Sequence, residues 1–143
     1  MKHTEIFDIL KPIACNLTDR RFRHVAAIVH RNKIIAFGHS HKKSHPFQLK
    51  YGKNEEAIYW HAETNVIFNA LKIVDAATLK RCRLYVCRIK CEDHDHNSLM
   101  FGLSKPCDGC QECIDEYQIP TLIYTMDGTF GKHHYGVEER DII

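Results

Sequence analysis

The sequence predicts an α/β fold: one three-layer domain over residues 1–143, with helices on both faces of a mixed central sheet. Three observations favour it. A length of 143 residues suits a single hydrophobic core. Short apolar runs alternate with stretches of helical periodicity, in the order helix, two strands, helix, strand, helix, strand. The β-α-β-α-β part of that order implies right-handed crossovers and an at least partly parallel sheet covered by helices.

The first third of the chain predicts a helix and a hairpin. Two largely buried strands are expected at His24–His30 and 33–38, joined by a turn at Arg31, Asn32 and Lys33. A helix is expected before them over residues 4–17, with one apolar face: Ile6, Ile9, Leu10, Ile13 and Ala14.

The rest of the chain alternates helices with strands. After a polar loop, helical spacing over 59–74 predicts a helix, and 82–89 predicts a strand. A second polar loop covers 90–105, and a helix is expected to begin near Cys107 and to end before Pro120. A last strand at 121–126 ends at Asp127-Gly128. The apolar positions of the 59–74 helix are Ala62, Val66, Ile67, Ala70, Leu71 and Val74.

Composition restricts the class of protein. Apolar residues make up 44% and charged residues 27%, as in ordinary globular proteins, and the net charge of +2 gives no strong field for nucleic acid. No apolar run approaches the roughly 20 residues of a membrane-spanning helix, and the amino terminus lacks a signal-peptide core. Seven clustered cysteines fit reduced thiols better than a disulfide framework. We therefore expect a cytoplasmic protein (or one in the cytoplasm of a host cell) without membrane association.

Two short motifs carry metal-binding chemistry, and each lies where a predicted strand gives way to a helix. The first is His61-Ala62-Glu63, and the second is Pro106-Cys107-Asp108-Gly109-Cys110. One imidazole and two thiolates are preferred zinc ligands, and three protein ligands leave a fourth position open for water. Helix amino termini favour the thiolate form of cysteine. The sequence therefore predicts one catalytic zinc held by His61, Cys107 and Cys110, with the non-ligating Glu63 beside its water.

Other interpretations of these cysteines exist. A CxxC pair alone is also typical of redox sites and of half a structural zinc site. A redox pair is usually found soon after the first strand, whereas this one follows the third, and its combination with HAE favours a catalytic metal. Cys113, one turn further along, is expected to face the core as a small buried residue and not to be a fourth ligand.

The HAE and PCxxC motifs, together with the order of elements, resemble the zinc-dependent cytidine and deoxycytidylate deaminase superfamily. The resemblance implies a cytidine deaminase-like fold and hydrolytic removal of the amino group from a cytosine base, with zinc-bound hydroxide attacking C4. Glu63 would shuttle the protons. The HAETN sequence is similar to the HAExN form of deoxycytidylate deaminases, so Asn65 is expected at the substrate.

One departure from the family concerns the substrate. Deoxycytidylate deaminases commonly carry Gly-x-Asn after the second strand, whereas this chain has Gly38-His39-Ser40, so Ser40 is a candidate for that contact. Lys42 and Lys43, in a loop that also carries His39, His41 and His45, could bind a phosphate or could simply be solvated. Ala62 and Pro106, inside the two motifs, complete the expected substrate contacts.

Three functions remain open at this point. The first is deamination of a small nucleotide (dCMP or CMP to dUMP or UMP), and the second is deamination of cytosine or adenine in single-stranded DNA or RNA. The second needs a basic groove with stacking aromatics. Aromatic residues do occur near the motifs (Phe47, Tyr51, Tyr59, Trp60 and Phe101), although core packing explains them as well. The third is a non-catalytic zinc-binding module, against which Glu63 argues.

Two further features are less informative. Cys82, Cys87, Cys91, His94 and His96 include ligand types, but their spacing is loose and does not favour a second, structural zinc. The tail from 128 to 143 could cover the pocket or lie at a subunit interface. A homo-oligomer is expected from the resemblance to assembling deaminases.

Overall fold

The computed structural model describes residues 1–17, 23–52, 59–91, 99–128 and 135–139. Within these ranges no helix combines the length and apolarity needed to cross a membrane. The elements run in the order α1 (His3–Cys15), β1 (His24–His30), β2 (Lys33–His39), α2 (Pro46–Leu49), α3 (Ala62–Ala70), α4 (Ala76–Leu79), β3 (Arg83–Cys91), β4 (Leu99–Gly102), α5 (Asp108–Glu116), β5 (Thr121–Thr125) and β6 (Tyr135–Glu139).

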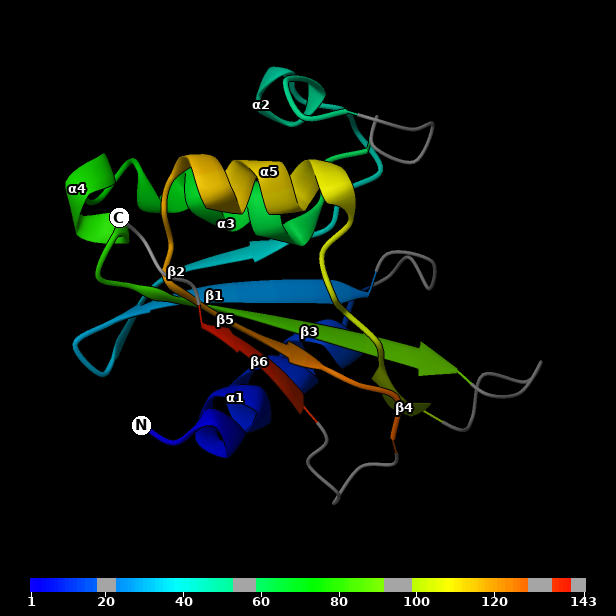
Figure 1. Ribbon diagram of the computed structural model, residues 1–143. Coiled ribbons are helices and arrows are strands. Elements are labelled where there is room, and N and C mark those ends of the chain that lie inside the picture. The colour runs from blue at the N-terminus through cyan, green and yellow to red at the C-terminus, as the bar shows by residue number, and fades with distance from the viewer. Residues whose placement is uncertain (18–22, 53–58, 92–98, 129–134, 140–143) are drawn as a thin grey trace.

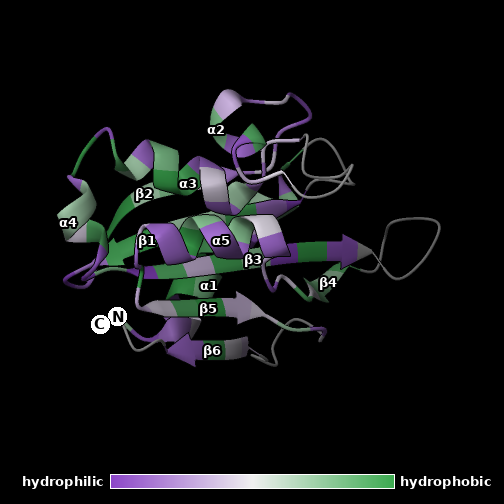
Figure 2. Cartoon of the chain, turned by 45° about the horizontal axis from the view of Figure 1, so that its top comes forward, coloured by the Kyte–Doolittle hydropathy of each residue, from purple (hydrophilic) through white to green (hydrophobic). Residues whose placement is uncertain are grey.

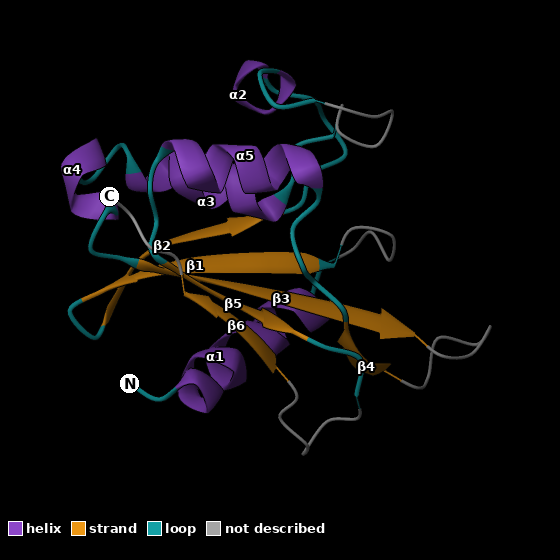
Figure 3. Ribbon diagram, in the orientation of Figure 1, coloured by secondary structure: helices purple, strands orange, loops and turns teal. Residues whose placement is uncertain are grey.

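The centre of the molecule is a mixed sheet of six strands among the described residues, in the order β2-β1-β3-β5-β6, with β4 beside β3. β3 and β5 run parallel, with α5 between them in the chain, and the other pairs are antiparallel. Helices α3 and α5 cover one face, and α1 covers the other (Figures 1 and 3). The predicted layered α/β fold with a mixed sheet is confirmed.

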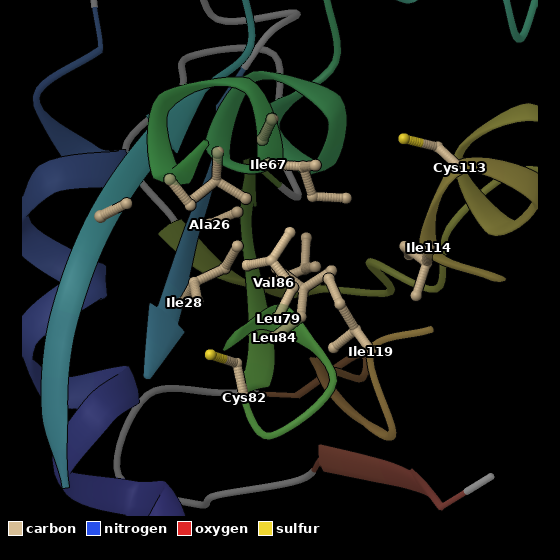
Figure 4. Close-up of a cluster of buried hydrophobic side chains, with 14 of the residues drawn as sticks. Ala26, Ile28, Ile67, Leu79, Cys82, Leu84, Val86, Cys113, Ile114 and Ile119 are labelled. Atoms are coloured by element: carbon tan, nitrogen blue, oxygen red, sulfur yellow. The ribbon is translucent and has the colours of Figure 1, made fainter. Parts of the chain in front are cut away.

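Alternating residues of the central strands fill two separate cores. Ala26, Ile28, Leu84 and Val86 point toward α3 and α5, as the close-up in Figure 4 shows. Their neighbours in the strands, such as Tyr85, pack against α1 on the opposite face. The side-chain alternation of a strand explains this division, and Figure 2 shows the hydrophobic colour through the middle of the sheet. Most of the hydrophobic burial therefore fixes α3 and α5 on one face.

The predicted apolar face of the first helix is partly wrong. Ile9 and Ile13 are 36% and 37% exposed, whereas Phe7 is 1% exposed. The Phe7 ring packs edge-on against Tyr85, with 5.7 Å between the ring centroids. Burying this larger aromatic surface rotates α1, so that Phe7 faces the sheet in place of two isoleucines. Ile6, Leu10 and Ala14 are buried as predicted.

The helix predicted over 59–74 is shorter in the structure. α3 begins at Ala62 because His61 has extended backbone angles and takes the N-cap position. The chain turns after Leu71, and the Asp75 side chain accepts a hydrogen bond from the Thr78 N–H (2.9 Å), which caps a separate short helix, α4. The hairpin strands and its turn agree with the prediction.

Two strands were not predicted. β4 lies inside the stretch expected to be a polar loop and pairs with the end of β3. β6 lies in the tail and extends the sheet beyond β5. Both are short, and each is stabilised by pairing with another strand of the sheet, an interaction that local periodicity does not reveal.

Candidate functional site

The two sequence motifs meet at the amino termini of α3 and α5. His61 is the N-cap of α3 and Cys107 is the N-cap of α5, and both have extended backbone angles. Neither side chain caps its own helix, so both are available to the site. Cys110 lies in the first turn of α5 and is fully buried. The positive ends of the two helix dipoles therefore stabilise negative charge where these side chains meet.

The geometry of the three donor atoms fits a zinc ion. The ligand atoms of His61, Cys107 and Cys110 lie within 4.8 Å of one another. The His61 Nδ1 atom is 3.2 Å from the Cys110 Sγ and 3.6 Å from the Cys107 Sγ. Tetrahedral zinc with ordinary Zn–N and Zn–S bond lengths places nitrogen and sulfur ligands about 3.6 Å apart. The group is positioned to bind one zinc ion, as the sequence predicted.

The two thiols have opposite tendencies to ionise. A hydrogen bond from the Cys110 thiol, together with His61, lowers the pKa of Cys107 to about 3. The proton shared with Cys107, and burial, raise the pKa of Cys110. The first thiolate therefore forms readily, and a cation is required to stabilise the second.

Glu63 follows His61 on the first turn of α3 and is only 5% exposed. Burial raises the pKa of its carboxyl, and the nearby His61 opposes this effect only in part. Its carboxyl also lies within hydrogen-bonding reach of Cys110. A carboxyl with a raised pKa beside a metal group can both accept and return a proton near neutral pH.

His61, Glu63 and Cys107 face one cavity of about 490 Å³, and Cys110 is buried behind them. Its wall contains His61, Ala62, Glu63 and Cys107 on the side of the helices. The other wall residues are His24, Ser40, Tyr59, Arg88, Leu103, Ser104 and Lys105. The size is in the range of small-molecule sites. Two cationic side chains, Arg88 and Lys105, therefore share the cavity with the metal donors.

Of the expected substrate contacts, Ser40 and Ala62 line this cavity. Among the wall residues that the structure describes, Lys42, Lys43, Asn65 and Pro106 do not appear. The buried Asn65 side chain instead accepts a hydrogen bond from the His39 N–H (3.0 Å) and so holds the end of β2 to α3. The cations of this wall are Arg88 and Lys105, and the phosphate contact of Lys42 and Lys43 stays a prediction.

Gln48 supports the metal group and was not predicted. Its side chain is fully buried in α2, and its Oε1 accepts hydrogen bonds from the His61 N–H (3.0 Å) and from the Thr64 hydroxyl. The carbonyl of Tyr51, just after α2, lies so close to Gly109 that a Cβ atom there would overlap it. The segment around α2 therefore contacts the first turns of both helices that carry metal donors.

Other cysteines and aromatic residues belong to the cores. Cys113 is fully buried in the core beneath α3 and α5, as predicted (Figure 4). Cys82 and Cys87 are also buried, in different cores. The Cys91 side chain, His94 and His96 lie outside what the structure describes, and so does most of the tail, apart from β6. The aromatic residues near the motifs have three placements. Phe47, Tyr51 and Phe101 are buried, Tyr59 lines the cavity, and Trp60 stacks on His45.

Two cavity residues that the sequence analysis did not single out, His24 and Arg88, share one signal. His24 and Arg88 occupy the same strand face as Ala26 and Val86, two positions away from each. A polar residue in series with core positions, at the end of a strand beside a ligand motif, indicates a pocket floor. That alternation was visible in the sequence.

Comparisons with known proteins agree with this site. The model of the family described as cytidine and deoxycytidylate deaminase zinc-binding region matches residues 1–126. The chain is similar to the crystal structure of cytidine deaminase from Burkholderia pseudomallei, with 20% identity and a TM-score of 0.58 over 97% of this chain and 93% of that one. It is also similar to dCMP deaminase from the cyanophage S-TIM5 in apo form, with 16% identity and a TM-score of 0.56 over 88% and 86% of the two chains. None of the curated proteins matches.

The two solved structures establish the shared fold, and the family match extends across both motifs. The His61, Cys107 and Cys110 donors within that match form the group that fits zinc. This chain belongs to the cytidine and deoxycytidylate deaminase family with a zinc-binding region.

Proposed function

We propose that this protein hydrolyses the exocyclic amino group from the cytosine base of a nucleotide, converting dCMP or CMP to the uracil nucleotide. One observation supports this most directly. A single cavity contains metal donors, the non-ligating carboxyl of Glu63 and the two cations Arg88 and Lys105. The metal donors and the Glu63 carboxyl are the groups needed for hydrolysis, and the two cations suit a negatively charged substrate.

His61, Cys107 and Cys110 hold zinc in this proposal. Zinc bound by three protein ligands lowers the pKa of a coordinated water to about 7 and so supplies a nucleophile at neutral pH. Glu63 does the proton transfer. Its carboxylate accepts a proton from the attacking water and passes it to the ring nitrogen beside C4. The C4–O bond forms in this step and leaves a hydroxyl on C4. Glu63 then accepts the proton of that hydroxyl and transfers it to the amino group; as the C4=O bond forms, the C4–N bond breaks and ammonia departs.

The environment of Glu63 suits this role. Burial raises the pKa of its carboxyl, so the protonated form is accessible during the reaction. Because Glu63 is only 5% exposed, its proton exchanges little with bulk water. In a purely structural zinc site, a buried non-ligating carboxyl would cost stability without a compensating use. The position of Glu63 therefore supports an enzyme over a binding module.

The cations favour a phosphorylated substrate. Arg88 is half-buried in the cavity wall, and its Nη1 donates a hydrogen bond to the Leu103 carbonyl (3.3 Å), which fixes the guanidinium. The Lys105 ammonium lies 3.4 Å from the Glu138 carboxylate of β6. A fixed guanidinium and a nearby ammonium are typical phosphate partners. A free nucleoside would offer these two cations no anionic group.

A polynucleotide substrate has less support. Single-stranded nucleic acid is usually bound by aromatic rings that stack on successive bases. Here the Trp60 ring packs against His45, with 3.9 Å between ring centroids, and against Phe68. These rings therefore pack against one another.

We also expect the protein to form a homo-oligomer, which analytical ultracentrifugation would measure.

A panel of substrates tests the proposal. Zinc-loaded protein would be assayed with dCMP, CMP, dCTP, cytidine, adenosine nucleotides and a cytosine-containing single-stranded oligonucleotide. We expect turnover of the cytosine monophosphates. Turnover of the oligonucleotide alone would refute the nucleotide assignment, and turnover of nothing would support a binding module.

Two variants test the phosphate site within the same panel. Arg88→Ala and Lys105→Ala should each raise KM for dCMP about tenfold or more, the loss expected for a charge-assisted hydrogen bond, and should affect cytidine much less. Arg81→Ala and Lys80→Ala are matched controls, since both side chains are exposed near the opposite end of β3. Loss of dCMP binding in Lys42→Ala and Lys43→Ala, with normal Arg88→Ala and Lys105→Ala, would place phosphate at the loop instead.

A further inference from the structure

Three polar side chains form a row across the sheet on one side of the cavity. His24 opens β1 and pairs with Arg88 of β3 in the antiparallel register. Ser40 follows β2, and its N–H donates a hydrogen bond to the His24 carbonyl (3.0 Å). All three residues line the cavity. Directly opposed residues of antiparallel strands lie about 4.5–5.5 Å apart, so the row is continuous.

This row lies on the face of the sheet that carries α3 and α5. Ala26 and Ile28 of β1 fill the core beneath these helices, and His24 is the next position in that series. On β3, Leu84 and Val86 belong to the same core, and Arg88 follows them. The apolar face therefore becomes polar where the two helices begin. Since metal donors occupy the helix termini, the row faces them across the cavity.

The Arg88 side chain has space because its neighbour on β4 is a glycine, which has no side chain. Gly102 of β4 pairs with Arg88, and a Cβ atom at Gly102 would lie 2.9 Å from the Arg88 Cδ. A larger residue would push the guanidinium away from its present position. The missing side chain at Gly102 therefore leaves space for the Arg88 guanidinium at the end of the row.

His24 is available to a ligand in the cavity. Its backbone groups bond with Ser40, whereas within the described part of the chain its imidazole makes no hydrogen bond. Burial, followed by the charges of Arg88 and His61, lowers the pKa of His24 to about 4. The ring is therefore neutral at neutral pH and offers one N–H donor and one acceptor nitrogen. Such a group suits a neutral polar partner such as a hydroxyl.

We propose that His24 hydrogen-bonds the 3′-hydroxyl of the nucleotide sugar and so recognises the substrate between its base and its phosphate. The inference rests on the proposed function. His24 pairs with Arg88 across β1 and β3 and lines the same cavity as His61. A nucleotide with its base at the metal donors and its phosphate at Arg88 places its sugar between them, beside His24.

This role also addresses the missing asparagine at position 40. The Ser40 Oγ accepts a hydrogen bond from the His24 N–H (3.3 Å), so its hydroxyl is directed at the backbone of β1. The imidazole of His24, one strand away, is longer and lines the same cavity. The polar contact with the substrate therefore moves from β2 to β1 in this chain.

A cycle of protein and substrate changes tests the proposal. His24→Phe keeps a planar ring but removes both nitrogens, and 2′,3′-dideoxycytidine monophosphate lacks the hydroxyl of dCMP. For the wild-type protein, we expect loss of the hydroxyl to lower kcat/KM about tenfold. His24→Phe should lower kcat/KM for dCMP by a similar factor and should no longer distinguish the two substrates. His24→Gln, which retains a donor and an acceptor, should recover part of the discrimination.

Equilibrium binding gives a second readout that does not depend on turnover. The dissociation constants of dUMP and its 3′-deoxy analogue should differ about tenfold for the wild-type protein and should be equal for His24→Phe. His30→Phe is the matched control: His30 lies on the same face of β1, six residues away, at the hairpin end. It should behave as the wild type in both assays. Zinc content near one per chain would establish that each variant is folded.

The outcomes separate the two proposals. Independent effects of the protein change and of the substrate change, with discrimination intact in His24→Phe, would overturn the role of His24 while leaving the nucleotide deaminase intact. Should His24→Phe fail to fold, His24→Gln decides the same question: discrimination below the wild-type value supports the role of His24, and discrimination equal to the wild-type value overturns it. If the wild-type protein deaminates no cytosine nucleotide, the proposed function fails and the role of His24 fails with it.

Discussion

Replacing Gln48 by leucine tests how the chain holds its zinc-binding histidine. Leucine preserves the apolar packing of this fully buried position but accepts no hydrogen bond. The His61 N–H, which donates to the Gln48 Oε1 at 3.0 Å, then loses its acceptor. We expect the affinity for zinc to fall about 10- to 100-fold, the usual effect of removing a group that orients a metal ligand.

The effect on folding should be small, because gains and losses nearly cancel. A buried donor without an acceptor costs about 1–3 kcal/mol, and the His61 N–H incurs this cost. The Thr64 hydroxyl keeps a second acceptor, the His61 carbonyl at 3.1 Å. Leucine also removes the Gln48 Nε2, a buried donor that has no partner among the described residues. The free energy of unfolding of the metal-free variant should therefore lie within about 1 kcal/mol of the wild-type value.

Two assays separate these effects. Competition with a chromophoric chelator measures zinc affinity, and urea unfolding of the metal-free protein measures stability. Gln111→Leu is the control, because Gln111 bonds Asp115 on the exposed side of α5 (3.2 Å) and should leave zinc affinity unchanged. Unchanged zinc affinity in Gln48→Leu, together with a stability loss of about 3 kcal/mol or more, would show that Gln48 serves the fold and not the metal group.

Three further predictions concern the site and its support. Glu63→Gln should lower the deamination rate about 10²- to 10⁴-fold while leaving about one zinc per chain by atomic absorption; loss of the zinc would show a structural role instead. Gly38→Ala should cost about 1–3 kcal/mol in urea unfolding, because the added Cβ would lie 2.8 Å from the Ala62 carbonyl and would overlap the Val66 backbone; a cost under about 0.5 kcal/mol would disprove that close contact. Cys113→Ala should keep about one zinc per chain, whereas Cys110→Ala should lose it; zinc loss in both would make Cys113 a ligand.

The metal group was predictable because its chemistry is local. His61 and Glu63 are two residues apart, and Cys107 and Cys110 are three apart, so each pair lies within one helical turn. Pro106 indicated where the second helix begins, and α5 does begin at Asp108. The order of the elements indicated that the two helix termini lie at the same edge of the sheet. The structure adds that their side chains meet there.

The residues that we propose as substrate contacts were harder to predict because they are distant in sequence. His24 and Arg88 become neighbours only through the register of β1 and β3. Lys105 has no pattern of its own beside the PCxxC motif, whereas Lys42 and Lys43 are adjacent in a histidine-rich loop, which made them candidates for the phosphate contact. Their role stays a prediction. Clustered charge in a sequence identifies a solvated loop as readily as a binding site.

Local patterns also failed where tertiary pairing determines structure. β4 and β6 have little apolar periodicity, and each exists because β3 or β5 offers an open edge. The contact of Gln48 with His61 joins residues 13 positions apart in the sequence. Such contacts depend on how α2 packs, and α2 is only four residues long.

The most direct test of the central claim is the release of dUMP and ammonia from dCMP by zinc-loaded protein. The wild-type protein should form the two products in equal amounts, Glu63→Gln should form them at least about a hundredfold more slowly with zinc still bound, and removal of zinc by a chelator should stop the reaction. If zinc-loaded wild-type protein, with about one zinc per chain, releases no uracil nucleotide from any cytosine nucleotide, the chain is not the deaminase proposed here.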